Sequence, residues 1–299
     1  MVAETLRLLA PERGGLFVDC TVGLGGHTRA LLEAGATQVL GFDRDPDALV
    51  HARDALAGFE DRVELIHADY RDLEQQLDAR GRQTVDGVLA DLGVSSLQLD
   101  AAERGFSFRT DAPIDMRMDT SRGPTAADLL RDVDETTLAN LIYEFGEERF
   151  SRRIARAIVR AREDAPIATT GQLAEIVRRA VPRRGYQRID PATRTFQALR
   201  IWVNRELEGL DDFVATAARH LRPGGRLVII TFHSLEDRIV KHTLRGLDRE
   251  RGLVQVLTKK PIEATEAEIE ANPRARSAKL RAAERLAEAE IGESEIERA

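Results

Sequence analysis

Two stretches decide the fold of this chain: VDCTVGLGGHT at residues 18–28 and GFDRDP at residues 41–46. The apolar run at residues 16–20 predicts a strand, and the glycines after it let the backbone turn sharply and approach a ligand closely. A helix is expected next, followed by a second buried strand that ends at Asp43. An acid about 20 residues beyond such a loop is placed to hydrogen-bond ribose hydroxyls. The two stretches therefore predict a site for a nucleoside cofactor.

The spacing of the glycines indicates which cofactor is favoured. A dinucleotide fingerprint, G-x-G-x-x-G, requires a third glycine at the position of Thr28. The pair Gly25-Gly26 instead suits a cofactor without a pyrophosphate, such as S-adenosylmethionine. A tight strand-to-helix turn in any α/β domain would use similar glycines, but the acid at ribose spacing favours cofactor binding.

Composition limits the class of protein. The chain has 299 residues, 42% of them hydrophobic, which suits one large or two moderate domains with a sizeable core. The single cysteine, Cys20, rules out an intramolecular disulfide and fits a reducing compartment. Residues 1–15 do not resemble a signal peptide, and no run approaches the ~20 apolar residues of a membrane span. We therefore expect a cytoplasmic protein without a membrane association.

Charge is segregated along the chain. Residues 149–205 contain fourteen arginines and four acids, a net charge of +10, which leaves −17 for the rest of a chain whose total is −7. Arginine binds phosphates bidentately and stacks on bases, so this segment favours nucleic acid as a partner. A solvated helix face is the alternative reading. The arginines are Arg149, Arg152, Arg153, Arg156, Arg160, Arg162, Arg178, Arg179, Arg183, Arg184, Arg188, Arg194, Arg200 and Arg205.

Strands and helices alternate through both ends of the chain, which predicts an α/β fold with a doubly wound parallel sheet. Strands are expected at residues 16–20, 39–42, 63–67, 85–90, 227–232 and 253–257. Helices are expected at residues 28–34, 46–57, 72–79, 196–221, 235–244 and 277–290. The helix at 235–244 is expected to begin with a capping box formed by Ser234 and Asp237.

The alternation stops in the middle of the chain, where no convincing strand is found. Capping boxes beginning at Thr125 and Thr169 indicate helices there instead. We therefore expect an all-helical domain at residues 104–194, inserted into a discontinuous α/β domain of residues 1–103 and 195–299.

Ligands of open parallel sheets bind beyond the carboxyl ends of the strands. Asp43 at such an end suits a ribose, Tyr70 suits stacking on an adenine ring, and Asp91 would lie between cofactor and substrate. Aspartate also serves as a helix N-cap, which is an equal alternative for Asp69, and for His233 a structural role is favoured. No cluster of cysteine and histidine has metal-ligand spacing, so no metal site is expected.

Motifs spread over nearly the whole chain resemble one family, the bacterial small-subunit rRNA cytosine-N4 methyltransferases, also called the RsmH or MraW family. The matching motifs are TVGLGGH at 21–27, DRDP at 43–46, DLGVSS at 91–96, ERGFSF at 103–108, DMRMD at 115–119, GEERF at 146–150, PATRTFQALRIWVN at 191–204, FHSLEDR at 232–238 and NPRARS at 272–277.

The resemblance implies a class I, Rossmann-like methyltransferase that uses S-adenosylmethionine and recognises its substrate through the inserted helical domain. It implies N4-methylation of one cytidine in the decoding region of 16S rRNA, within the small ribosomal subunit. Asp91 is the candidate catalytic residue. The cofactor contacts implied by the family's motifs are Gly25, Gly26, His27, Asp43, Tyr70, Asp91 and Gln98.

The chain departs from the family's pattern at a few positions. Leu97 replaces a usual proline ahead of Gln98, and Tyr70 replaces a common phenylalanine. Family members usually begin with further residues ahead of the position of Met1, so a longer N-terminus is expected.

Two other functions remain alternatives. One is a nicotinamide-dependent oxidoreductase, which Thr28 at the third glycine position disfavours. The other is a non-catalytic ribosome-assembly factor that binds RNA through its arginines. The oligomeric state stays open, with a homodimer among the options.

Overall fold

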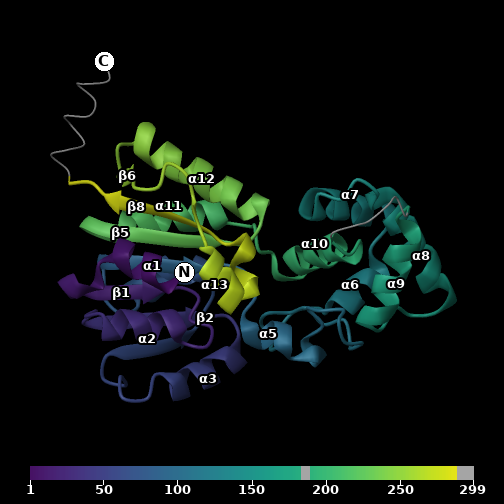
Figure 1. Cartoon of the computed structure of the whole chain (residues 1–299), viewed down its shortest axis with the longest axis horizontal. Coiled ribbons are helices and arrows are strands. Elements are labelled where there is room, and N and C mark those ends of the chain that lie inside the picture. Colours follow the sequence, from purple (N-terminus) through teal and green to yellow (C-terminus); the bar gives the residue numbers. More distant parts are fainter. Residues whose placement is uncertain (183–188, 288–299) are drawn as a thin grey trace. The chain divides into compact units, whose positions relative to one another are not determined.

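The computed structural model describes residues 1–182 and 189–287, and the chain divides into two compact units (Figure 1). The first unit comprises Met1–Gly93 and Leu207–Ala299, and the second comprises Val94–Glu206. The insertion expected at residues 104–194 lies inside the second unit, which extends further in both directions.

The first unit is built on an eight-stranded sheet in the order β3-β2-β1-β4-β5-β8-β6, with β7 paired to β8. Strands β1 to β5 pair in parallel, and β8 runs antiparallel to its neighbours. The strand order reverses at β1, which lies between β2 and β4, so this is the switch point where ligands are expected. The strands are β1 Leu16–Asp19, β2 Gln38–Asp43, β3 Val63–His67, β4 Val85–Asp91, β5 Leu221–Thr231, β6 Val254–Val256, β7 Ile262–Glu263 and β8 Lys279–Arg285.

Helices cover both faces of this sheet (Figure 1). Phe17 and Val18 are neighbours on β1 but belong to different apolar clusters, because successive side chains of a strand point to opposite faces. The Val18 cluster includes residues of α4, α11 and α12, and the Phe17 cluster includes residues of α1, α2 and α3. The predicted doubly wound sheet is therefore confirmed. The helices are α1 Val2–Leu9, α2 Gly26–Glu33, α3 Pro46–Ala55, α4 Leu73–Asp78, α11 Leu210–His220, α12 Ser234–Arg249 and α13 Glu266–Ala271.

The second unit is helical. Its described residues contain no strand, only an isolated bridge between Pro113 and Thr169. Thr125 and Thr169 form the predicted capping boxes, with Asp128 and Gln172 respectively. Among all described residues of the chain, no helix combines the length and apolarity that crossing a bilayer requires. The helices are α5 Ser96–Asp100, α6 Ala126–Asp132, α7 Glu135–Gly146, α8 Ser151–Asp164, α9 Thr170–Ala180 and α10 Ala192–Asn204.

Short 3₁₀ helices connect several of these elements. They are η1 Pro11–Arg13, η2 Tyr70–Asp72, η3 Ala102–Arg104 and η4 Pro273–Ser277.

The single helix predicted at residues 196–221 is wrong. Two helices replace it, α10 and α11, and they belong to different units. Arg205 ends α10 with a φ of 51°, in the left-handed region that commonly ends a helix, and Gly209, with a φ of 67°, is the N-cap of α11. A side chain as large as arginine rarely adopts this conformation, so the sequence carried no strong stop signal there.

The helix predicted at residues 277–290 is also wrong in its described part. Residues 279–285 form β8, which pairs with β5 on one side and with β6 and β7 on the other. Leu280, Ala282 and Ala283 are fully buried there. Alanine, arginine and glutamate favour helices, but sheet pairing and burial outweigh that weak preference. Residues 288–290 lie outside the described part of the chain.

The helix cap predicted at Ser234 lies one residue earlier. His233 is the N-cap of α12, and its Nδ1 atom accepts a hydrogen bond from the Glu236 amide at 3.4 Å. The ring also lies against the Glu236 carboxylate, with Nε2 3.1 Å from Oε1. His233 therefore has the structural role that was favoured for it, as the cap of α12, and the absence of a substrate contact stays a prediction.

Candidate active site

Asp43 connects the glycine loop to the second strand. It ends β2, and its Oδ2 atom accepts a hydrogen bond from the Gly23 amide at 2.7 Å. Its Oδ1 atom accepts from the Asp45 amide at 2.8 Å. Burial raises the pKa of Asp43 to about 6, although these two backbone donors act in the opposite direction. The carboxylate is thus fixed at the end of β2, where burial makes its charge pH-sensitive, and its contact with a ribose stays a prediction.

His27 and Asp91 form a pair at the same edge of the sheet. His27 lies in the first turn of α2, and Asp91 is the last residue of β4. The His27 Nε2 atom lies 3.5 Å from Asp91 Oδ2. The backbone of Asp91 is also fixed, because its amide donates to the Thr21 hydroxyl at 2.6 Å. Burial opposes a charged imidazole, but the hydrogen bond and charge of Asp91, with the charge of Asp19, raise the pKa of His27.

This pair leaves polar atoms and space for a ligand. In the described part of the chain, His27 Nδ1 and Asp91 Oδ1 are buried and have no hydrogen-bond partner. Buried polar atoms without partners are rare in proteins, and each needs an explanation. A Cβ atom added at Gly23 or Gly26 would meet no atom within 4 Å, so the loop borders open space. The orphaned atoms and the open loop fit a polar nucleoside cofactor.

Asp19 is a site residue that the sequence reasoning missed. Its carboxylate is completely buried at the end of β1 and accepts from the Thr28 hydroxyl at 2.7 Å and from the Thr21 amide at 3.1 Å. Burial raises its pKa. These contacts explain Thr28 at the third glycine position, since its hydroxyl has a buried partner. The available signal was an acid at the end of β1, as at the ends of β2 and β4.

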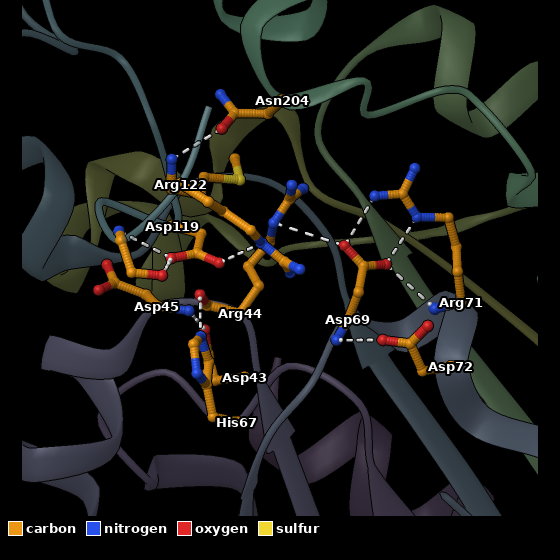
Figure 2. Close-up of polar contacts among 12 residues, drawn as sticks. Asp43, Arg44, Asp45, His67, Asp69, Arg71, Asp72, Asp119, Arg122 and Asn204 are labelled. Carbon is orange, nitrogen blue, oxygen red and sulfur yellow. Dashed lines mark hydrogen bonds and ion pairs between the residues drawn. The ribbon is translucent and has the colours of Figure 1, made fainter. Parts of the chain in front are cut away.

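Asp69 serves as a helix cap and an ion-pair partner. It caps η2 and accepts from Arg71 Nε at 2.7 Å and Arg71 Nη2 at 2.8 Å, while Arg44 Nε lies 3.5 Å away. Figure 2 shows its carboxylate between the two guanidinium groups. Burial opposes ionisation, but Arg71 and Arg44 together hold the pKa of Asp69 below its usual value. Of the two roles left open for Asp69, the structure shows the cap.

Tyr70 is buried next to this cluster, at 8% exposure. Its ring centroid lies 4.8 Å from that of Phe213 on α11, with the planes tilted by 56°. The Arg71 guanidinium lies 5.7 Å from the Tyr70 ring centroid. The ring is thereby packed just after β3, and its stacking on an adenine stays a prediction.

Gln98 belongs to the second unit, in α5. Its side-chain oxygen accepts from the Ser95 amide at 3.0 Å, and the Ser95 hydroxyl accepts from the Gln98 amide at 3.2 Å. This capping box fixes the start of α5. A cofactor contact by Gln98 stays a prediction.

The DMRMD motif has a structural role within the second unit. Met116 has a φ of 62°, and the segment is held by Asn204, which donates to the Met116 carbonyl and accepts from the Met118 amide, both at 2.7 Å. Figure 2 shows Asp119 of this motif paired with Arg122 at 2.6 Å. The motif's residue types are therefore explained in part by folding of this loop.

The arginines of the second unit fall into two groups. Several bind partners inside the unit, as Arg178 does with Asp190 and Arg200 does with Glu206. Arg183, Arg184 and Arg188 lie outside the described residues. The exposed arginines of α8 form a surface that we call the arginine face. Arg156 of this face lies 3.4 Å from Glu135. No other ion pair or hydrogen bond within the described chain involves these arginines. The arginine face comprises Arg152, Arg153, Arg156 and Arg160.

Comparison with known proteins identifies the family. A model of the MraW methylase family matches residues 1–286. Three similar proteins, each named ribosomal RNA small subunit methyltransferase H, come from Geotalea uraniireducens, Deinococcus radiodurans and Synechococcus elongatus. The Geotalea protein is 49% identical, over 96% of this chain and 97% of its own length. The Deinococcus protein is 57% identical, over 96% of this chain and 89% of its own length. The Synechococcus protein is 54% identical, over 95% of this chain and 92% of its own length. With the predicted sheet in place and a match over nearly its whole length, the chain belongs to the MraW methylase family.

Proposed function

We propose that this protein transfers a methyl group from S-adenosylmethionine to the N4 amine of one cytidine in the decoding region of 16S rRNA, within the small ribosomal subunit. Family membership and the names of the relatives support methylation of small-subunit rRNA. The observation that carries the proposed chemistry is the buried Asp91 Oδ1 atom, which has no partner in the described chain and lies at the switch-point edge of the sheet.

The proposed cofactor contacts follow from the geometry of the first unit. Asp43 accepts hydrogen bonds from ribose hydroxyls, and the backbone at Gly25 and Gly26 approaches the cofactor closely because neither residue has a side chain. His27 offers Nδ1 as a polar contact. Tyr70 and Gln98 complete the proposed set. S-adenosylmethionine supplies an electrophilic methyl group when it is bound there.

Asp91 has two proposed tasks. The N4 amine of cytosine is a poor nucleophile because its lone pair is delocalised into the ring. A carboxylate that accepts a hydrogen bond from the amine orients the nitrogen, and rapid transfer requires that nitrogen to lie about 3–3.5 Å from the methyl carbon and in line with its bond to sulfur. The amine must lose a proton once the new nitrogen–carbon bond forms, and the proposal gives that proton to Asp91 Oδ1, which has no other partner in the described chain. His27 beside Oδ2 fixes the orientation of the carboxylate.

The proposed substrate must present an accessible base. A paired or stacked cytidine has to leave its stack before an enzyme can reach the amine, unless it is already unpaired. The arginine face supplies exposed positive charge that can hold the RNA backbone through its phosphates.

One experiment separates this proposal from its alternatives. Purified protein is incubated with tritiated S-adenosylmethionine and with small subunits from a strain that lacks the gene, and the rRNA is digested to nucleosides for mass spectrometry. The proposal expects label in N4-methylcytidine. Transfer to another nucleoside would retain a methyltransferase and remove the N4 assignment. RNA binding without transfer would favour an assembly factor, and reduction of a nicotinamide cofactor would favour the oxidoreductase.

A further inference from the structure

A basic pocket lies within the first unit, between α12 and the strands β6 and β8. Its volume is about 280 Å³. Five of its charged lining residues are basic and one is acidic. We call it the basic pocket, and its charged residues are Lys241, Arg245, Asp248, Arg249, Lys259 and Arg281.

The spacing of the basic residues on α12 lowers the stability of this helix. Lys241, Arg245 and Arg249 follow one another at four-residue intervals, so they lie on one face. Like charges at this spacing destabilise a helix. The helix dipole favours a cation in the last turn, which accounts for Arg249, but the effect does not extend to Lys241 in the middle of the helix. An anion bound between these side chains would offset this repulsion.

The acids around the basic pocket already have partners. Arg281 is buried and donates to both oxygens of Asp237, at 2.6 Å and 3.1 Å. Asp248 accepts from the Val256 amide at 3.2 Å. By contrast, no hydrogen bond or ion pair in the described chain involves Lys241, Arg245 or Lys259. These three side chains therefore give the basic pocket positive charge that no acid of the described chain pairs with.

We propose that the basic pocket binds a phosphate of the substrate RNA backbone, as a contact separate from the arginine face. This inference rests on the proposed rRNA substrate. Lysine binds phosphate as a point charge and arginine binds it through paired N–H groups, so both residue types fit this ligand. A pocket of this size admits a phosphate with part of its sugar, which suits a single backbone contact. Because the chain outside residues 149–205 carries −17, a polyanion is repelled by most of that surface and is attracted where cations gather.

The test uses a triple variant of the full chain, Lys241→Gln, Arg245→Gln and Lys259→Gln. The matched control removes three positive charges from exposed arginines elsewhere in the first unit, with Arg7→Gln, Arg13→Gln and Arg53→Gln. Affinity for isolated small subunits is measured over a series of salt concentrations. Each phosphate contact on single-stranded RNA contributes ~0.7 to the log–log salt slope, so the pocket variant, which loses one such contact, should lose ~0.7 from the slope and at least about tenfold in affinity. Affinity for S-adenosylmethionine should equal that of the control.

The proposal is overturned if the pocket variant and the control have the same salt slope. It is also overturned if inorganic phosphate protects the pocket lysines from acetylation while RNA binding is unaffected by the substitutions, because the ligand is then a small anion. Failure of the proposed function looks different. In that case the wild-type protein does not methylate small subunits, whereas the salt slope still depends on the basic pocket.

Discussion

The imidazole of His27 lies against the carboxylate of Asp91, with 3.5 Å between Nε2 and Oδ2. The two residues come from the first turn of α2 and the end of β4, so the pair joins the glycine loop to the strand beside it in the sheet. One polar atom of each side chain remains buried without a partner in the described chain. The pair therefore combines a fixed orientation with unused hydrogen-bonding capacity, which is the arrangement that a reacting ligand requires.

Substituting Asp91→Asn should reduce methyl transfer to small subunits by about 10²–10⁴-fold, the range for losing a positioned proton acceptor. The fold should survive, because Thr21 is bound by the backbone amide of residue 91, which asparagine retains. Single-turnover methylation at saturating cofactor and RNA measures the effect. Asp54→Asn, at an exposed position on α3, is the matched control. A rate near that of wild type would reduce Asp91 to a structural role.

The same variant has a spectroscopic consequence at His27. Because Asp91 is the main group that raises the pKa of His27, that pKa should fall in Asp91→Asn. A histidine whose pKa is higher in the folded than in the unfolded protein stabilises the folded state. This stabilisation is complete at pH values below the unfolded pKa of about 6.5, and it is lost as the pH rises through the folded pKa. The variant should therefore lose more stability at pH 6 than at pH 9. NMR titration of His27 and thermal unfolding at both pH values check these points, and an unaltered His27 pKa would contradict the pairing.

Asp43→Ala should weaken S-adenosylmethionine binding by ~1.5–3 kcal/mol, the scale for losing a hydrogen bond to a charged group. Isothermal titration calorimetry measures this effect directly. Unchanged affinity would remove Asp43 from the cofactor site.

Cofactor affinity of the wild-type protein should also depend on the ionisation of Asp43. The pKa of this carboxyl is raised to about 6, and ribose hydroxyls donate best to the ionised form. Lowering the pH through about 6 should therefore weaken binding, by at most roughly tenfold per pH unit for one proton. Calorimetry between pH 5 and 8 tests this, with Asp43→Asn as the comparison. A wild-type dependence that persists in Asp43→Asn would assign the proton to another group.

Replacing Arg152, Arg153 and Arg160 by glutamine should weaken binding to small subunits and flatten its salt dependence. Each lost phosphate contact should lower the log–log slope by ~0.7–1. These three were chosen because Arg156 contacts Glu135. Cofactor affinity should not change. The control is again Arg7→Gln, Arg13→Gln and Arg53→Gln, and a slope equal to that of the control would make the arginine face a solvated surface.

Cys20→Ser should keep methyltransferase activity within about tenfold of wild type, since no bond between enzyme and base is needed for a nitrogen target. Methylation at carbon 5 would instead use a cysteine thiolate that adds to the ring. Burial, followed by the charges of Asp19 and Asp69, raises the pKa of Cys20 well above its ordinary value, so its thiol is a poor nucleophile. Mass spectrometry of the product nucleoside gives the second readout. An inactive but folded variant that binds cofactor, or a 5-methylcytidine product, would overturn the N4 assignment.

The α/β core could be predicted from the sequence because its signals are local. Short apolar runs bounded by glycine and aspartate indicate strands β1 to β4 without knowledge of their partners. The glycines before His27 and the acids Asp43 and Asp91 were placed correctly at strand ends for the same reason. Parallel strands bring their carboxyl ends to one edge, so chain order alone predicted which residues would share it.

Contacts between distant segments required the tertiary structure. Strand β8 has a helix-favouring composition, and only its pairing with β5 and β6 makes it a strand. The helix predicted at 196–221 breaks at Arg205, which adopts a left-handed conformation. The residue type at this position does not predict that conformation. The partner of Thr28 could not be read from spacing, since any buried acceptor would satisfy its hydroxyl.

Local composition and spacing thus determined the fold class and the edge of the sheet where the acids gather, and the resemblance of the motifs indicated the family. The tertiary structure decided which atoms remain unpaired at that edge, and it brought α12, β6 and β8 together around the basic pocket. Backbone preferences act over a few residues and can therefore be predicted from the sequence. The pairing of buried polar atoms depends on distances that exist only after folding.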